Sequence, residues 1–186
     1  MRVTVEPDQI RAAFESVMDD PSFDESRGLW ERGHPPVEMI QAMALRPEIL
    51  RAFAGFGGAV YPGGLLERRV QELVIITSSQ RNECQFCVNA HVDIVDIEDI
   101  VDDPLRHIAD PATLPVRERL AVAYTKAVLA DSNRLPDDLM AEVHAAFTDP
   151  ELVELTFLIG YINLLNLFNN SLGVRYHGDY RALLDG

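Results

Sequence analysis

Apolar residues recur at intervals of three and four along almost the whole chain, which is the spacing of one face of an α-helix. No segment shows the sustained alternation of apolar and polar residues that is typical of a half-buried strand. The sequence therefore predicts an all-α fold. Its 186 residues, 47% of them hydrophobic, are enough for one contiguous core. Because no Gly-, Ser- or Pro-rich linker interrupts the pattern, we expect residues 1–186 to form a single helical-bundle domain.

Prolines and glycines indicate where the helices begin and end. Residues 1–36 are expected to form an N-terminal helix and then an irregular extension, since residues 19–36 are polar and contain three prolines and two glycines. This extension could shape a substrate entrance or a partner site. The core is expected over residues 37–172, with the glycines of residues 55–58 in a loop. The predicted core helices cover residues 37–44, 65–81 and 84–95, and further helices begin at Pro47, Pro115, Pro136 and Pro150.

The charge of the chain narrows the function classes. It carries 16 Lys and Arg residues against 30 Asp and Glu residues, a net charge of −14. A surface with this charge repels polyanions, so neither nucleic-acid binding nor docking on anionic lipid is expected. The sequence shows no long uninterrupted apolar run that would span a membrane. The N-terminal residues also lack the apolar core of a signal peptide, so we expect a cytoplasmic protein.

Two short segments of the chain resemble each other at an offset of 82 residues. Residues 70–73 read Val-Gln-Glu-Leu, and residues 152–155 read Leu-Val-Glu-Leu. Carried forward, the offset sets Asn166 opposite Cys84. A degenerate duplication of a helical pair would explain this match, and so would chance among common helix formers.

Only two cysteines occur, Cys84 and Cys87, and His91 follows one helical turn later. At about 100° per residue, the three side chains share one face of a helix. In a reducing compartment such a pair is a redox dithiol, half of a zinc site or two buried apolar thiols. A closed zinc site needs four ligands, and the sequence offers no second pair and no other histidine at a fitting spacing. We therefore favour the redox dithiol and expect neither a metal nor a cofactor.

The position of Cys84 at the start of a predicted helix bears on its reactivity. Unpaired N–H groups and the positive end of the helix dipole favour a thiolate there, and the thiolate is the nucleophilic form of cysteine. One helical turn joins Cys84 to Cys87, so the pair can close a disulfide. His91 could take a proton from one thiol or pair with its thiolate.

Glu72, twelve residues before Cys84, has two interpretations. In the first, it lies at the surface and pairs with Arg68, four residues earlier. In the second, the chain turns at Asn82, a residue type that tolerates the left-handed conformation. The two helices then pack side by side and return Glu72 to the cysteines as a proton acceptor. Spacing alone favours the surface pair.

Residues 66–91 resemble the signature of the alkylhydroperoxidase D-like branch of the carboxymuconolactone decarboxylase family. The match consists of Glu72, Cys84 twelve residues later, Cys87 and His91. A looser resemblance extends over residues 36–170. The resemblance implies an all-helical fold of this type and a thiol-dependent oxidoreductase that reduces hydroperoxides. The decarboxylase members use no cysteine pair, so their lactone chemistry is not implied.

The resemblance also assigns roles to these residues. It implies that Cys87 is the more buried thiol, which attacks the peroxide. Cys84 would be the exposed thiol, which resolves the intermediate and exchanges with an external dithiol of the lipoyl or thioredoxin-like kind. His91 and Glu72 would relay protons, which moves Glu72 to the functional interpretation. Family members assemble as trimers or hexamers, so a homo-oligomer is implied as well.

Phe86 departs from the family pattern. The best-known peroxidase members carry a second histidine at this position, just before the second cysteine, and a phenylalanine cannot carry a proton. The relay would then depend on Glu72, His91 or water, and weak peroxidase activity or a disulfide substrate becomes an option. Two other function classes stay open, a redox sensor that switches without turnover and a helical scaffold with incidental cysteines.

Overall fold

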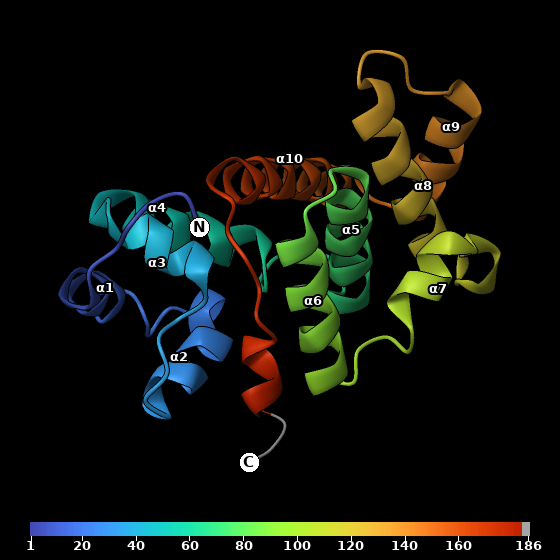
Figure 1. Ribbon diagram of the computed structural model, residues 1–186. Coiled ribbons are helices and arrows are strands. Elements are labelled where there is room, and N and C mark those ends of the chain that lie inside the picture. The colour runs from blue at the N-terminus through green and yellow to red at the C-terminus, as the bar shows by residue number, and fades with distance from the viewer. Residues whose placement is uncertain (184–186) are drawn as a thin grey trace. The chain divides into compact units, whose positions relative to one another are not determined.

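The computed structural model describes residues 1–183 and confirms the all-α prediction. Within this range it contains ten α-helices and three short 3-10 helices and no strand (Figure 1). The chain divides into two compact units. Within the described range, the first comprises residues 1–64 and 168–183, and the second is Leu65–Leu167. The thiol motif lies entirely within the second unit.

The first unit corrects two predictions about irregular structure. Residues 19–36 are largely helical rather than an irregular extension, and the glycines of residues 55–58 continue a helix rather than forming a loop. The helices of this unit are α1 (Pro7–Phe14), η1 (Pro21–Phe23), α2 (Asp24–Glu31), α3 (Glu38–Ala44), α4 (Pro47–Val60) and η3 (Asp179–Leu183).

Packing explains both differences. In the polar stretch, Phe23, Ser26 and Leu29 are buried at a spacing of three, so a sparse helical face anchors α2 in spite of its composition. In α4, Gly57 is buried on the same face as Leu50 and Ala54, seven and three residues earlier. Tertiary contacts of that face outweigh the poor helix propensity of glycine.

The second unit is arranged around one buried helix, α5. Every residue of α5 from Val70 to Ser79 is buried, as its apolar centre predicts. Because α5 is buried on all sides, its polar side chains Glu72 and Thr77 also lie in the interior. The helices of this unit are α5 (Arg68–Arg81), α6 (Gln85–Ile97), α7 (Pro104–Ala109), η2 (Pro111–Thr113), α8 (Val116–Asp131), α9 (Asp137–Ala146) and the greater part of α10 (Asp149–Leu172).

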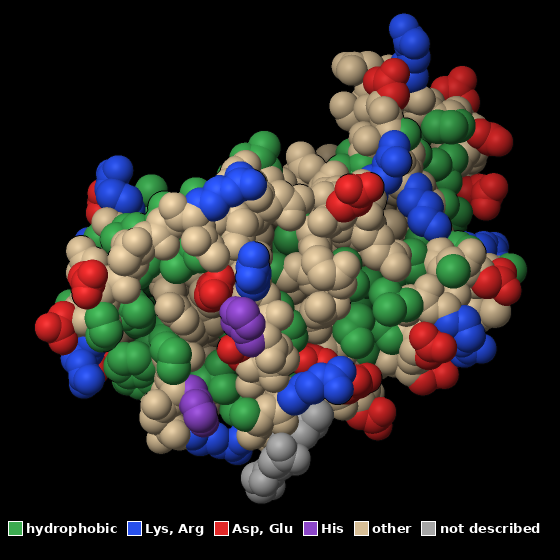
Figure 2. All heavy atoms as spheres, in the orientation of Figure 1, with side chains coloured by type: hydrophobic (Ala, Val, Ile, Leu, Met, Phe, Trp, Pro, Cys, Tyr) green, Lys and Arg blue, Asp and Glu red, His purple; other side chains and the backbone are tan. Residues whose placement is uncertain are grey.

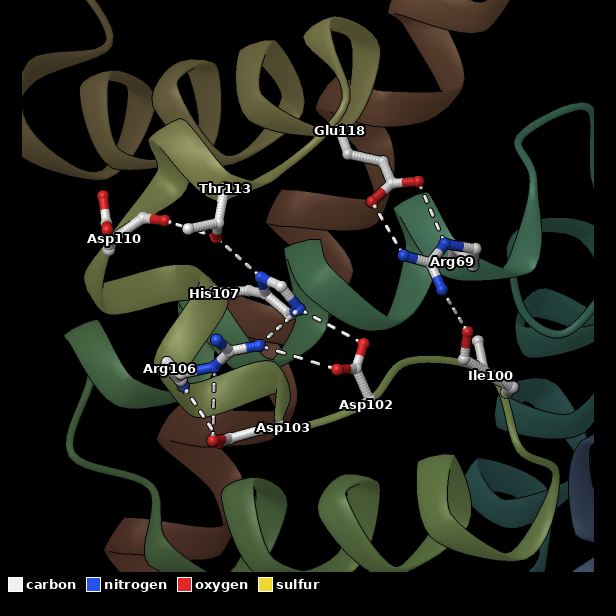
Figure 3. Close-up of polar contacts among 9 residues, drawn as sticks. All are labelled: Arg69, Ile100, Asp102, Asp103, Arg106, His107, Asp110, Thr113 and Glu118. Atoms are coloured by element: carbon white, nitrogen blue, oxygen red, sulfur yellow. Dashed lines mark hydrogen bonds and ion pairs between the residues drawn. The ribbon is translucent and has the colours of Figure 1, made fainter.

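The chain between α6 and α8 is held by polar contacts that converge on His107 (Figure 3). One ring nitrogen, Nδ1, lies 2.7 Å from Thr113 Oγ1, and the other, Nε2, lies 3.3 Å from Asp102 Oδ1. The imidazole lowers the pKa of Asp102 by hydrogen bonding to its carboxylate. Since Asp102 precedes α7 and Thr113 follows it, His107 ties both ends of α7 together.

The long helix α10 begins at a capping arrangement. The backbone N–H and hydroxyl of Thr148 both donate to Glu151 Oε2 at 2.8 Å, and these bonds, joined by Arg117, lower the pKa of Glu151 to about 2. The helix ends at Gly173, whose φ of 61° is the left-handed value that favours glycine.

Two features of α10 bear on earlier expectations. It is continuous through residues 164–166, where an offset of 82 would place the break between α5 and α6, so the helical pair is not repeated there. Contrary to the expectation from the apolar runs, α10 is also long and apolar enough to cross a membrane, with a mean hydropathy of 1.4. A core helix meets the same criteria, so this is weak evidence for a span.

Acidic and basic side chains are interspersed on the face of the molecule shown in Figure 2. No continuous basic surface is visible on that face. This mixture agrees with a sequence that carries 16 Lys and Arg residues and 30 Asp and Glu residues.

Candidate thiol site

A tight turn joins α5 to α6 and places the first cysteine. The N–H of Cys84 donates to the carbonyl of Ser79 at 2.9 Å, and the N–H of Glu83 donates to the carbonyl of Gln80 at 3.2 Å. This pair of bonds is a Schellman motif, which needs one residue in the left-handed conformation. That residue is Glu83, with a φ of 54°, and not Asn82 as the sequence predicted.

The side chain of Asn82 instead forms hydrogen bonds with α10. Its Nδ2 donates to Oδ1 of Asn163 and to Oδ1 of Asn166, both at 2.9 Å, which anchors the turn to α10. Asn166 is fully buried and donates in turn to Ser79 Oγ at 3.1 Å. The interpretation of the motif missed Ser79 and Asn166 as anchors of the cysteine turn. No local sequence signal pointed to them, because the contact joins residues 87 positions apart.

The two sulfur atoms form a close pair at the start of α6. Cys84 is the residue that caps the helix, Cys87 lies in its first turn, and their Sγ atoms are 2.8 Å apart as free thiols. The implied burial order is wrong, because Cys84 is 0% exposed and Cys87 is 5% exposed. Cys84 follows the Schellman turn directly and is fully buried, whereas the resemblance implied that it is the accessible thiol.

Glu72 is fully buried and joins α5 to α6. Its Oε2 lies 2.8 Å from Nδ1 of His91, and its Oε1 lies 3.2 Å from a guanidinium nitrogen of Arg68. The predicted contact with Arg68 is therefore present, but the predicted surface location is wrong. The structure instead has the second arrangement, in which the chain turns after α5 and Glu72 returns to the helix that carries the cysteines.

The charges of this site are compensated within the chain. A carboxylate in a buried position is costly unless it is paired and hydrogen-bonded, and Glu72 is bracketed by a guanidinium and an imidazole. Arg68 also forms an ion pair with the exposed Glu98 at 3.4 Å, so the chain of ion pairs extends from buried Glu72 to the surface. With Nδ1 held by Glu72, His91 is oriented by a carboxylate in the way that catalytic imidazoles are.

The helix α6 sets the relation between the imidazole and the thiols. His91 is four residues after Cys87, so their Cβ atoms are neighbours one turn apart on the same face, about 5–6 Å from each other. Phe86 occupies the position of the second histidine of the peroxidase members and is buried. Among residues 1–183, no three His, Cys, Asp or Glu side chains gather in a way that could hold a metal ion. The arrangement is suited to thiol chemistry with proton transfer.

Comparison with known proteins gives the site its family. A model of the carboxymuconolactone decarboxylase family matches residues 47–127, which include all four residues of the thiol signature. The uncharacterized protein YnjA of Escherichia coli (strain K12) is 32% identical over 125 residues, which are 62% of this chain and 69% of YnjA. The chain belongs to the carboxymuconolactone decarboxylase family.

Solved structures share the fold of this family member. One is the alkylhydroperoxidase AhpD core of a peroxidase-related protein from Ralstonia eutropha JMP134. It is 23% identical, has a TM-score of 0.74, and is matched over 96% of this chain and 93% of that chain. The apo debrominase Bmp8 is 18% identical, with a TM-score of 0.70 over 100% of this chain and 96% of that chain. At these identities the likeness shows an AhpD-like fold and no particular substrate.

Proposed function

We propose that this protein is a cytoplasmic thiol peroxidase that reduces hydroperoxides with the Cys84–Cys87 pair. The observation that carries the proposal is the 2.8 Å approach of the two free sulfur atoms at the start of α6, next to an imidazole oriented by a buried carboxylate. The cytoplasm keeps thiols reduced between turnovers. Membership of the family and the peroxidase-related Ralstonia structure support the reaction class.

The proposed cycle balances with one external dithiol. The thiolate of Cys87 attacks the terminal peroxide oxygen, the O–O bond breaks, and an alcohol leaves as Cys87 becomes a sulfenic acid. The thiol of Cys84 then attacks that sulfur, forming the disulfide and releasing water. The external dithiol reduces the disulfide by exchange and is itself oxidised.

His91 and Glu72 serve the proton movements of this cycle. Because Glu72 engages Nδ1, the imidazole exchanges protons through Nε2, taking one from the Cys87 thiol and returning it to the leaving alkoxide. Phe86 adds no proton carrier beside Cys87. We therefore expect slower peroxide reduction than in relatives with a histidine there, and a stronger dependence on His91.

The first test compares single cysteine variants for peroxide consumption with a dithiol donor. Cys87→Ser should lower the rate by about two orders of magnitude or more, because the nucleophile is lost. Cys84→Ser should retain the first oxidation, so that a sulfenic acid accumulates on Cys87 and reacts with dimedone, detected by mass spectrometry. Wild-type protein should give the Cys84–Cys87 disulfide instead.

Three outcomes would count against this proposal. Dimedone labelling of Cys84 in the Cys87→Ser variant, with none on Cys87 in the Cys84→Ser variant, would reverse the order of attack, as the helix start alone favours. A disulfide that forms once with peroxide but supports no turnover with any dithiol would indicate a redox sensor. Absence of any peroxide-dependent disulfide would leave the cysteines without a redox role.

We further propose that the protein is a homo-oligomer, a trimer or hexamer, that assembles through α10. Four large apolar side chains on this helix are at least half exposed, namely Val153, Phe157, Leu164 and Leu167. They recur at intervals of three, four and seven, so they form one stripe, and exposed apolar stripes of this kind mark interfaces.

Light scattering during size-exclusion chromatography should give a trimer or hexamer for the wild type and a smaller species for Phe157→Glu. A monomeric wild type would refute the assembly.

A further inference from the structure

A cavity of the Leu65–Leu167 unit is lined by none of Glu72, Cys84, Cys87 and His91. Its volume is about 600 Å³, which is within the range of small-molecule sites. Three helices contribute to its wall, each through residues on one face. The lining includes Thr77, Gln80 and Arg81 from α5, Ile108 from α7, and Lys126 and Ala130 from α8.

The cavity gathers positive charge in a strongly acidic protein. Lys126 is the only lysine in the sequence, and Arg81 lies with it in the lining. In the part of the chain that the structure describes, neither cation forms an ion pair with a carboxylate, although most of the charged residues around α5 do. Two such cations at one cavity are suited to an anionic ligand.

Thr77 adds an independent sign of a ligand. Its side chain is 2% exposed, lines the cavity, and its Oγ1 has no hydrogen-bond partner within the described range. A buried hydroxyl left without a partner costs about 1–3 kcal/mol, so most such groups are satisfied. A ligand oxygen in the cavity would accept this hydrogen bond. Thr77 and Arg81 are one helical turn apart, so both reach the same ligand group.

The opposite wall is fixed in position before any ligand arrives. The ammonium of Lys126 donates to the carbonyl of Ile108 at 2.9 Å, at the end of α7, and retains two further N–H donors. The short helix α7 is itself clamped at both ends through His107 (Figure 3). A site whose cation and apolar wall are held by existing bonds loses less conformational freedom when it binds a ligand.

We propose that this cavity binds a small organic monocarboxylate. Arg81 and Lys126 would pair with the carboxylate, Thr77 would donate to it, and Ile108 and Ala130 would pack against the apolar body. The carboxylate of Glu83 also lines the cavity and leaves a net lining charge of one, which disfavours a dianion such as a phosphate ester. The apolar wall disfavours a bare inorganic anion. Glu83 also belongs to the turn before Cys84, but the proposed carboxylate contacts use no residue of the thiol signature.

Calorimetry with benzoate and hexanoate as probes tests the proposal, with benzyl alcohol and hexanol as neutral counterparts. At least one carboxylate should bind one site per chain with a dissociation constant below about 1 mM, and its alcohol at least about tenfold more weakly. Arg81→Gln and Lys126→Gln should each weaken binding by about tenfold. Arg51→Gln removes an equal charge from an exposed position of α4 and should leave binding unchanged.

Two further measurements keep the test independent of folding and of the peroxidase. Because Lys126 is the only lysine, acetic anhydride forms stable side-chain amides only there, and the bound carboxylate should slow acetylation of Lys126 in the wild type, measured by mass spectrometry of the Lys126 peptide. The double variant Cys84→Ser/Cys87→Ser should bind as the wild type does. The proposal is overturned if neither carboxylate binds, if an alcohol binds as tightly, if Arg51→Gln weakens binding as much as Arg81→Gln, or if Lys126 is not protected.

Discussion

The thiol site and the cavity proposed to bind a carboxylate both contain residues of α5. They differ in whether their charged side chains are paired. In the thiol site, the fully buried Glu72 is matched by Arg68 and His91 at 3.2 Å and 2.8 Å. In the cavity, Arg81 and Lys126 have no carboxylate partner among the described residues. In the thiol site the buried charge is paired without a ligand, whereas in the cavity two cations lack a carboxylate partner within residues 1–183.

This difference follows from where the charges lie. A charge inside the protein must be paired, since desolvation otherwise costs several kcal/mol. A cation at the rim of an open cavity is hydrated, so it costs little when it is alone and remains available to a ligand. The ion pairs of Glu72 therefore serve to orient the side chains of the thiol site. The cations around the buried Thr77 hydroxyl instead indicate a site that binds a ligand.

The largest expected difference between the two regions concerns stability. Glu72→Ala removes the partner of two cations in the interior and should lower the free energy of unfolding by about 3 kcal/mol. Arg81→Ala removes a hydrated cation and should change it by less than about 0.5 kcal/mol. Urea unfolding at pH 7, followed by circular dichroism, measures both values.

A matched variant separates charge from packing at Glu72. Glu72→Gln keeps the volume and one oxygen acceptor, so its loss of stability should be smaller than that of Glu72→Ala, while peroxide reduction should fall because His91 loses its carboxylate. Equal stability of wild type and Glu72→Ala would contradict the view that this carboxylate is compensated inside the protein. A large loss with Arg81→Ala would contradict the view that Arg81 has no carboxylate partner in the protein.

Local sequence signals predicted much of the thiol site. The apolar centre of α5 foretold its burial, and the spacing of Cys84, Cys87 and His91 put three reactive groups on one helical face. The left-handed residue was misplaced by one position. Asn82 is the better residue for that conformation, but its side chain is recruited by Asn163 and Asn166, more than 80 positions away, and a local rule cannot include such a contact.

Other features depend on packing that no local pattern carries. The polar composition of residues 19–36 hid three buried side chains that hold a helix, and the glycines of α4 are tolerated because Gly57 lies on a buried face. The predicted exposure of Cys84 came from the family resemblance and is wrong, because the side chain is fully buried in the folded chain. The cavity was not predicted at all, since a missing hydrogen bond at Thr77 is visible only once the neighbouring helices are in place.

Two buried threonines give a smaller but sharper test of the same contrast. Thr77 on α5 has no partner for its hydroxyl, whereas Thr125 on α8 is fully buried and donates to the carbonyl of Ala121 at 2.7 Å. Valine replaces each with the same branched shape. Thr77→Val should raise the free energy of unfolding by about 1 kcal/mol, because an unsatisfied polar group is removed, and Thr125→Val should lower it by about 1 kcal/mol, because a hydrogen bond is lost.

Binding should move in the opposite direction from stability at Thr77. The same Thr77→Val variant should bind benzoate or hexanoate about threefold more weakly, since the carboxylate loses one hydrogen bond, whereas Thr125→Val should bind it as the wild type does. A group that lowers stability while raising affinity is one whose partner is the ligand, because its cost is present only while the cavity is empty. If both valine variants lose stability equally and neither changes binding, the hydroxyl of Thr77 is an ordinary core group. The carboxylate would then have to be held by the two cations alone.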